Sequence, residues 1–355
     1  MRAHVAWIAA AAVAALLAAC GDEPRHGVVH VSAEAPAGGN GTRAHPWRSL
    51  RRALQSADPG DTIVLAHGTY GRRGTRFTIV RGGAPDRPIT IRGRAGDRRP
   101  RLLGHVQVRA DHVRLSDLAF EGPTGRVAPV TDDNPHGEEV PVWIRGDEVE
   151  IVRCEVSHSR WHAGIYITGD GARILANHIH HNGDFGNPDQ AGLDHGIYWG
   201  AGRGGVIANN LIDANYAYGV QLYPGPQRVR VVGNTIVGNG LAGVILSDAA
   251  AGNTVASNII AFNGRPSITF ELQGTDNRLA GNLFWANGET AVEVPDPVEQ
   301  AANIVADPGF VGGSDYRLRA GSPALDRALP AYSAPRDIRG LPRSRPADIG
   351  AFERE

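Results

Sequence analysis

The feature that most constrains the fold is a six-residue pattern, with asparagine at its first and last positions, that recurs along the chain. The copies begin, in chain order, at Cys154 (a weaker copy), Asn177, Asn210, Asn234, Asn258 and Asn282. The last four are separated by a constant step of 24 residues. A fixed period of this kind is typical of architectures in which each repeat is one structural unit that packs only against its neighbours.

Each copy of the pattern is followed by a short segment in which apolar and variable residues alternate. Gly196-Ile197-Tyr198-Trp199 and Gly219-Val220-Gln221-Leu222 are examples, with apolar residues first and third after the glycine. Alternation with period two predicts a strand with one buried face and excludes a helical solenoid. A step of 24 residues is also too short for a four-stranded propeller blade. The sequence therefore predicts an all-β parallel β-helix whose coils stack about 4.8 Å apart, with the asparagines forming a side-chain ladder at a turn.

The composition agrees with this fold and excludes several functions. The 355 residues include 46 glycines and 23 prolines, which is typical of a chain rich in turns. A formal net charge of −1 gives no electrostatic attraction for nucleic acid. All 36 basic residues are arginine, so no mechanism can depend on a lysine. Two cysteines cannot build a disulfide framework.

The first 26 residues are predicted to direct export rather than to fold. Residues 1–19 form a signal peptide with an apolar stretch of about 15 residues, which is shorter than a membrane span requires. Its end, Leu17-Ala18-Ala19-Cys20, resembles the lipobox of bacterial lipoproteins. The resemblance implies cleavage before Cys20, lipidation of its thiol and a membrane anchor on the extracytoplasmic or cell-surface side, with residues 20–26 as a tether. An ordinary cleaved signal peptide is the alternative.

The rest of the chain is predicted to form a capped solenoid. Residues 27–70 form the N-terminal cap, with an amphipathic helix from Pro46 to Leu54. Residues 71–300 form the β-helix, and residues 301–355 form an irregular C-terminal cap in which the period is lost. Caps are expected because a solenoid must cover its open core.

Several motifs resemble a known group of proteins. They are Gly60-Asp61-Thr62-Ile63-Val64-Leu65, Gly68-Thr69-Tyr70, the asparagine-glycine coils and the closing Asp348-Ile349-Gly350-Ala351-Phe352. Over roughly residues 27–353 the chain resembles the right-handed parallel β-helix proteins of the pectate-lyase-like superfamily. The resemblance implies a single-stranded right-handed β-helix. It leaves the activity open, because members include polysaccharide lyases, glycoside hydrolases, uronan epimerases and proteins without known activity.

Two insertions interrupt the array, at residues 122–141 and 183–191. Insertions in solenoids usually gather on one face, which is often the binding face. Histidines gather in the same part of the chain. Six of the 14 lie between residues 158 and 195, namely His158, His162, His178, His180, His181 and His195.

Aligning the strands predicts two outward columns near these insertions. The first contains Trp143, Tyr166 and Tyr198 and continues to Gln221, and its aromatic part suits sugar stacking. Packing beneath the inserted loops is the alternative. The second column is the residue before each strand glycine, and it places His195 and Tyr218 about 5 Å apart at the backbone.

These columns could serve β-elimination or C5 epimerisation of an acidic polysaccharide. His195 suits the base because the usual pKa of histidine is near neutrality, and Asp194 could orient its imidazole. Tyr198 or Tyr218 could be the acid. An arginine would pair with the substrate carboxylate, either Arg228 or Arg203. The predicted catalytic residues are His195, Tyr198, Tyr218, Asp194 and Arg228, and the predicted substrate-binding residues are Trp143, Tyr166, Gln221, Tyr223, His162, His181 and Arg203.

No cofactor is required by this chemistry, but Ca²⁺ is a second option for neutralising the carboxylate. Asp184, Asn187 and Asp189, with Asp194, are oxygen ligands of the right type, although their spacing matches no known calcium loop. A zinc site at His178, His180 and His181 is disfavoured because neighbouring outward residues do not converge on one ion.

Two other functions stay open at this stage. A glycoside hydrolase would use paired carboxylates, for which the candidates are Asp170, Asp194, Asp213, Glu138 and Glu139, but no pair is fixed by the sequence. A non-catalytic β-helix that binds glycan or acts as a structural element needs no such groups.

Overall fold

The computed structural model describes residues 27–122, 140–160, 162–183, 194–247, 249–271, 274–288 and 298–355. The predicted signal peptide, the tether and Cys20 lie outside these ranges, as do most of both insertions and the calcium candidates Asp184, Asn187 and Asp189. Within the described ranges, no helix combines the length and apolar character needed to cross a membrane.

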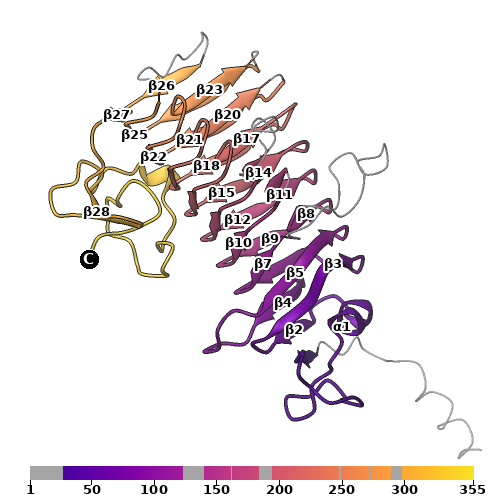
Figure 1. Cartoon of the computed structure of the whole chain (residues 1–355). Helices are drawn as coiled ribbons and strands as arrows, with labels where there is room; N and C mark the ends of the chain where they lie inside the picture. The colour runs from indigo at the N-terminus through magenta and orange to yellow at the C-terminus, as the bar shows by residue number, and fades with distance from the viewer. Residues whose placement is uncertain are drawn as a thin grey trace, which may run out of the picture.

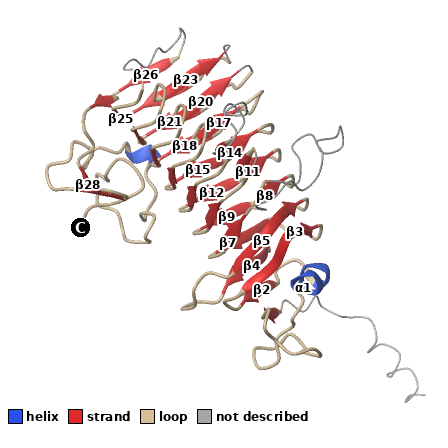
Figure 2. Cartoon of the chain, in the orientation of Figure 1, coloured by secondary structure: helices blue, strands red, loops and turns tan. Residues whose placement is uncertain are grey.

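The described chain forms an elongated stack of coils in which short strands repeat along one axis (Figures 1 and 2). The strands form three faces, which we call A, B and C. Face A is an 11-stranded parallel sheet. Its strands are β1 (Val28–Val31), β2 (Thr62–Leu65), β4 (Ile89–Gly93), β6 (Val113–Ser116), β9 (Glu150–Val152), β12 (Arg173–Leu175), β15 (Val206–Ala208), β18 (Arg230–Val232), β21 (Thr254–Ala256), β24 (Arg278–Ala280) and β26 (Glu299–Ala301).

Faces B and C belong to one 16-stranded sheet that bends around two sides of the stack. The bend occurs at β5 (Arg101–Val108), which pairs with β3 (Thr69–Ile79) and then with strands of both faces. Face B consists of β8 (Val142–Ile144), β11 (Ala163–Ile167), β14 (His195–Trp199), β17 (Val220–Leu222), β20 (Val244–Ser247) and β23 (Ile268–Glu271). Face C consists of β7 (Ala119–Glu121), β10 (Glu155–Ser157), β13 (His178–His180), β16 (Leu211–Asp213), β19 (Thr235–Val237), β22 (Ile259–Ala261), β25 (Leu283–Trp285) and β27 (Ile304–Val305).

The predicted asparagine ladder is confirmed, and there are two long ones. Between faces A and C, the amide of Asn210 donates to Asn234 at 2.9 Å, and Asn234 donates to Asn258 at 2.9 Å. Between faces C and B, Asn215 donates to Asn239 at 2.9 Å. Each ladder amide also bonds to backbone groups of neighbouring coils, so buried polar groups at the corners are satisfied. Cys154 occupies the weaker copy, and its N–H donates to the oxygen of Asn177 at 2.8 Å.

Each corner between faces A and C turns through one residue in the left-handed backbone region. This residue precedes the ladder asparagine, and only some corners use glycine. Ala176, Ser257 and Gly281 have φ values of 54°, 53° and 61°. Ladder hydrogen bonds therefore hold residues with side chains in a conformation that glycine adopts more readily.

The N-terminal end is covered by helix α1 (Leu50–Ser56), which buries Leu50, Ala53 and Leu54. The predicted amphipathic helix is thus present but starts later than Pro46. Ser49 caps it by accepting a hydrogen bond from the N–H of Arg52, and Trp47 forms a β-bridge with Val31. The predicted boundary at residue 70 does not separate a cap from the solenoid, because β1 and β2 already belong to face A.

The C-terminal segment lies along the side of the solenoid, where Figure 1 shows it in yellow beside the last coils. After β26 and β27 continue faces A and C, the chain forms an antiparallel hairpin of β28 (Phe310–Gly312) and β29 (Asp315–Leu318) and a short 3-10 helix, Pro330–Tyr332. Phe310, Leu318 and Ile349 pack in one cluster with Leu211 and Ile259 of face C. This segment covers the outer surface of face C as well as following the final coil.

Candidate functional site

The strand register of face B confirms the first predicted outward column, but its three aromatic side chains are buried rather than exposed, with 6% to 8% of each accessible to solvent. Trp143 pairs with Tyr166, Tyr166 pairs with Tyr198, and Tyr198 pairs with Gln221. The column starts one strand earlier than predicted, because Gln107 of β5 pairs with Trp143. The flanking residues Ile165, Ile167 and Ile197 point into the core. The aromatic rings therefore line the outside of the solenoid at the coils that carry the insertions.

The second predicted column adds His195 and Tyr218 to these rings, and His162, which precedes Ala163 of this column, lies beside them. Ala163 pairs with His195, and the ring of His195 stacks on that of Tyr218 at a centroid distance of 5.3 Å. The His195 ring lies 5.6 Å from that of Tyr198, and the His162 ring lies 5.0 Å from Tyr198. We call the group formed by Trp143, His162, Tyr166, His195, Tyr198 and Tyr218 the ring cluster.

His195 and Tyr198 share one side of β14 because the strand departs from simple alternation at Gly196. A Cβ on Gly196 would lie 2.7 Å from the carbonyl oxygen of Gly219 and 2.8 Å from Nδ2 of Asn215, so this position faces the interior. Ile197 also faces the core. Two successive inward residues bring His195 and Tyr198 onto the same outer side, which strict period two would not do.

Burial sets the protonation states in the ring cluster. His195 is 1% exposed, and desolvation lowers the pKa of its imidazole to about 3. Burial also raises the pKa of Tyr166 to about 12 and raises that of Tyr198 further, with Tyr166 and Tyr223 adding to the effect. Near neutral pH the imidazole is therefore uncharged and both phenols carry their protons. Within the described part of the chain, Nδ1 of His195 has no hydrogen-bond partner.

Asp194 is buried beside His195, and one of its hydrogen bonds is to the preceding coil. Its Oδ1 accepts the backbone N–H of His162 at 2.6 Å, while the backbone N–H of His195 donates to the carbonyl of His162 at 2.6 Å. Asp194 thereby holds the two histidine-bearing strands in register. The predicted contact with the His195 imidazole stays a prediction.

The two predicted arginines lie away from these rings. Arg203 follows β14 on the turn toward face A, where its N–H donates to Asp170 and its backbone bridges to Gln227. Arg228, exposed, occupies the equivalent turn one coil later, with its backbone N–H bonded to Ala251. No contact of either guanidinium with the ring cluster is found among the described residues.

Arg145 is an arginine beside the ring cluster that the sequence reasoning missed. Its guanidinium carbon lies 4.9 Å from the centre of the Trp143 ring, and its charge opposes the burial that raises the pKa of Tyr166. The signal was present, because Arg145 is two residues after Trp143 and so shares its outward side. His105 was missed as well. Its ring lies 6.3 Å from Trp143, and burial lowers its pKa to about 4.

Gln221 and Tyr223 extend this surface beyond Tyr198. Gln221 continues the column and is partly exposed, and it pairs with Ile245 on its other side. Tyr223 ends the same coil and is 41% exposed. On face B, the accessible end of the predicted substrate-binding column is therefore at these two residues.

The histidines gathered in the sequence fall into two groups in space. His162 and His195 belong to the ring cluster on face B. His181 lies with His158, His178 and His180 at face C, where Nδ1 of His181 is 2.9 Å from Nδ1 of His180. His178 pairs with Asp213 at 2.7 Å and His180 with Glu155 at 3.3 Å. His181 is thus separated from the ring cluster, and no group of metal-ligating side chains is found among the described residues.

Comparisons with known proteins agree with this architecture. The family described as "Right handed beta helix region" matches residues 137–284. The structure of pectate lyase Pel9A aligns with a TM-score of 0.60 at 16% identity, over 93% of this chain and 96% of that chain. A structure titled "Glycoside hydrolase" aligns with a TM-score of 0.51 at 9% identity, over 78% of this chain and 96% of that chain. The structure of the periplasmic alginate epimerase AlgG aligns with a TM-score of 0.49 at 14% identity, over 70% of this chain and 60% of that chain. No curated protein sequence matches the chain significantly.

The protein is a right-handed parallel β-helix. Its fold matches that of pectate lyase Pel9A, and the predicted right-handed β-helix is confirmed.

Proposed function

We propose that the protein acts on an acidic polysaccharide, by β-elimination or by C5 epimerisation of a uronate residue. The observation that carries this proposal is the ring cluster, in which a neutral imidazole and protonated phenols lie within one outward surface. Pectate lyase Pel9A, by its title a lyase, has the same fold over nearly the whole chain, and this supports the substrate class.

Elimination requires a proton to leave C5 of the uronate. In the proposed step, a ring nitrogen of His195 accepts this proton and the C5–H electron pair forms the C4=C5 double bond. The C4–O bond then breaks, and the hydroxyl of Tyr198 protonates the leaving oxygen. In epimerisation the C4–O bond stays intact and a tyrosine returns a proton to the opposite face of C5. At the lowered pKa His195 is unprotonated near neutral pH, and at the raised pKa Tyr198 keeps its proton, so each group is in the protonation state that the step requires.

The carboxylate next to C5 needs a cation to stabilise the charge that develops. Arg145 is the arginine best placed for this, since its guanidinium contacts the Trp143 ring at the edge of the cluster. Arg228 and Arg203 would instead contact a chain that extends over the turn toward face A. Trp143 and Tyr166 would stack on sugar rings, and their own ring centres are 5.4 Å apart. Ca²⁺ bound through Asp184, Asn187 and Asp189 is the alternative cation in this proposal.

A non-catalytic role, as a glycan-binding or structural β-helix, is the second candidate, and one observation favours it over catalysis. The six side chains of the ring cluster are only 1% to 8% exposed, whereas a base must reach its substrate. Hydrolysis by paired carboxylates has less support. Asp213 is paired with His178 on face C, Asp170 lies on the turn toward face A, and Asp194 is buried beside His162.

An assay on soluble acidic polysaccharides tests the proposal. Polygalacturonate, alginate and hyaluronan would be incubated with the protein, and the short-wavelength ultraviolet absorbance of the conjugated C4=C5 product would report elimination. Deuterium incorporation at C5 in D₂O, followed by NMR, would report epimerisation. We expect one signal with the wild type and its loss in His195→Ala, while His180→Ala, which removes a histidine of face C, keeps it. Binding without either signal would support the glycan-binding role instead.

The proposal includes export. The lipobox-like segment ending at Cys20 would place the protein on the extracytoplasmic side, where acidic polysaccharides are accessible. Metabolic labelling with a palmitate analogue, compared with Cys20→Ala, tests this part separately.

A further inference from the structure

A cavity lies on another side of the solenoid from the ring cluster, beneath the C-terminal segment. It has a volume of about 400 Å³ and is bounded by the outer surface of face A and by residues 328–350. Its walls come from β12, β15 and β18 on one side and from Tyr332 and Pro335 on the other. Face B, which carries the ring cluster, does not contribute to it. A cavity of this size is suited to a small molecule rather than to a polysaccharide chain.

The floor of this cavity is apolar. Leu175, Val206, Ala208 and Val232 point outward from face A and form one cluster with Tyr332 of the C-terminal segment. A ligand body without polar groups would displace water from this floor.

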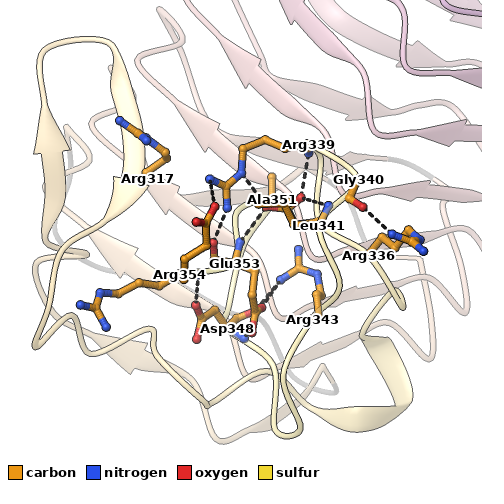
Figure 3. Close-up of polar contacts among 12 residues, drawn as sticks. Arg317, Arg336, Arg339, Gly340, Leu341, Arg343, Asp348, Ala351, Glu353 and Arg354 are labelled. Atoms are coloured by element: carbon orange, nitrogen blue, oxygen red, sulfur yellow. Dashed lines mark hydrogen bonds and ion pairs between the residues drawn. The ribbon is translucent and has the colours of Figure 1, made fainter.

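The wall holds a buried guanidinium with an unused donor. Arg343 is 4% exposed and bonds to Glu353 at 3.0 Å, to Asn209 at 2.6 Å and to the carbonyl of Gly350 at 2.7 Å. Figure 3 shows its guanidinium turned toward Glu353 and Asp348. Its Nε is buried and has no hydrogen-bond partner in the described chain. A buried donor of this kind is normally satisfied, so the wall has capacity for one more acceptor.

The rim provides a second guanidinium, that of Arg230. It lies in the same outward column as Arg173 and Arg278, with Val206 between it and Arg173. Glu150 pairs with Arg173 at 3.5 Å, and Glu299 pairs with Arg278 at 3.2 Å. Arg230 lines the cavity, and no carboxylate partner for it is found in the described ranges.

The remaining charges leave Arg230 uncompensated. Glu353 neutralises Arg343, and Glu150 lies between Arg114 and Arg173. Asp348 also lines the cavity, but its two oxygens accept backbone N–H groups of Asp326 and Arg354 at 2.8 and 2.7 Å. Arg230 is therefore a guanidinium of the cavity with no carboxylate partner among the described residues, and it provides a place for one ligand carboxylate.

We propose that this cavity binds a small organic carboxylate with a compact apolar body. The carboxylate pairs with the guanidinium of Arg230, whose planar fork matches two oxygens, and the apolar body covers Val206 and Ala208. The site is independent of the ring cluster and of the proposed reaction.

Titration of the full chain with benzoate, cyclohexanecarboxylate and neutral benzamide tests this proposal, with ligand-detected NMR as the readout. We expect both carboxylates to bind and benzamide not to bind. Arg230→Gln should weaken carboxylate binding by about tenfold or more, because a charge-assisted pair is lost. Arg278→Gln is the matched control, since it removes an arginine of the same column outside the cavity, and it should leave the affinity unchanged.

A steric variant separates the cavity from surface charge. Ala208→Leu fills the floor without changing charge and should also abolish binding, with the melting temperature checked for both variants. Failure of both carboxylates to bind at millimolar concentration would overturn the proposal. So would equal affinity in wild type and Arg230→Gln, or binding that survives Ala208→Leu.

Discussion

The rings of His195 and Tyr218 stack at 5.3 Å with an interplanar angle of 24°, although they come from successive coils. The contact follows from the one-coil register of face B, in which each residue before a strand glycine lies above its counterpart. The stacking helps to shield the imidazole of His195 from water, which is why its pKa is low. Packing between coils and the chemistry of the candidate site are thus coupled.

Acidification should destabilise the protein through His195. The pKa of this residue is lowered in the folded state to about 3 from an ordinary value of 6.5. Between these values the unfolded chain binds more protons than the folded one, so the free energy of unfolding falls as pH falls below 6.5. We expect urea denaturation from pH 7.5 to pH 5 to show a smaller loss in His195→Gln than in wild type. An identical loss in the two proteins would contradict this.

Arg145→Gln should weaken binding of the acidic polysaccharide by about tenfold, because a charge-assisted hydrogen bond to a carboxylate is lost. Affinity electrophoresis in gels containing each polysaccharide would measure it. Arg228→Gln serves as the comparison. If the second variant alone weakens binding, the carboxylate is bound at the turn toward face A and Arg145 has no role.

Removing one member of a ladder should cost stability in proportion to its burial. Asn258 accepts from Asn234, donates to Asn282 at 3.0 Å and donates to the carbonyl of Val231 at 2.8 Å. Asn258→Ala leaves several buried groups unpaired, and we expect a loss of about 3 kcal/mol in the free energy of unfolding.

The end of the same ladder provides the control for this prediction. Asn303 is partly buried and accepts from Asn282 at 3.1 Å. Asn303→Ala should therefore cost less, because water can replace the lost partner. Equal losses by chemical denaturation would argue against burial as the cause.

Gly196→Ala should destabilise the coil that carries His195. The new methyl group would lie 2.7 Å from the carbonyl oxygen of Gly219, and backbone must shift to accommodate it. We expect a loss of about 2 kcal/mol, together with a changed environment of His195 in NMR spectra. Gly225→Ala is the control, since its nearest neighbour would be at an ordinary 3.5 Å. If Gly196→Ala leaves the free energy of unfolding unchanged, the interior at this corner is not tightly packed.

The sequence by itself determined the solenoid, its ladders and its columns. In a stack of coils each residue meets its counterparts one period before and after, so a 24-residue repeat encodes contacts such as Gln221 with Ile245 directly. Outward and inward sides followed from alternation. The same reasoning could have found Arg145, which shares the outward side of Trp143.

Only the tertiary structure decided what the period does not encode. It separated His181 from His195 by placing them on different faces, and it brought Arg343 to Asn209 across 134 residues of sequence. It also set the pKa of His195, which depends on how completely other side chains exclude water. A repeat specifies contacts between neighbouring coils. Contacts of the non-repeating C-terminal segment, and the burial that results from all contacts together, have no periodic signal in the sequence.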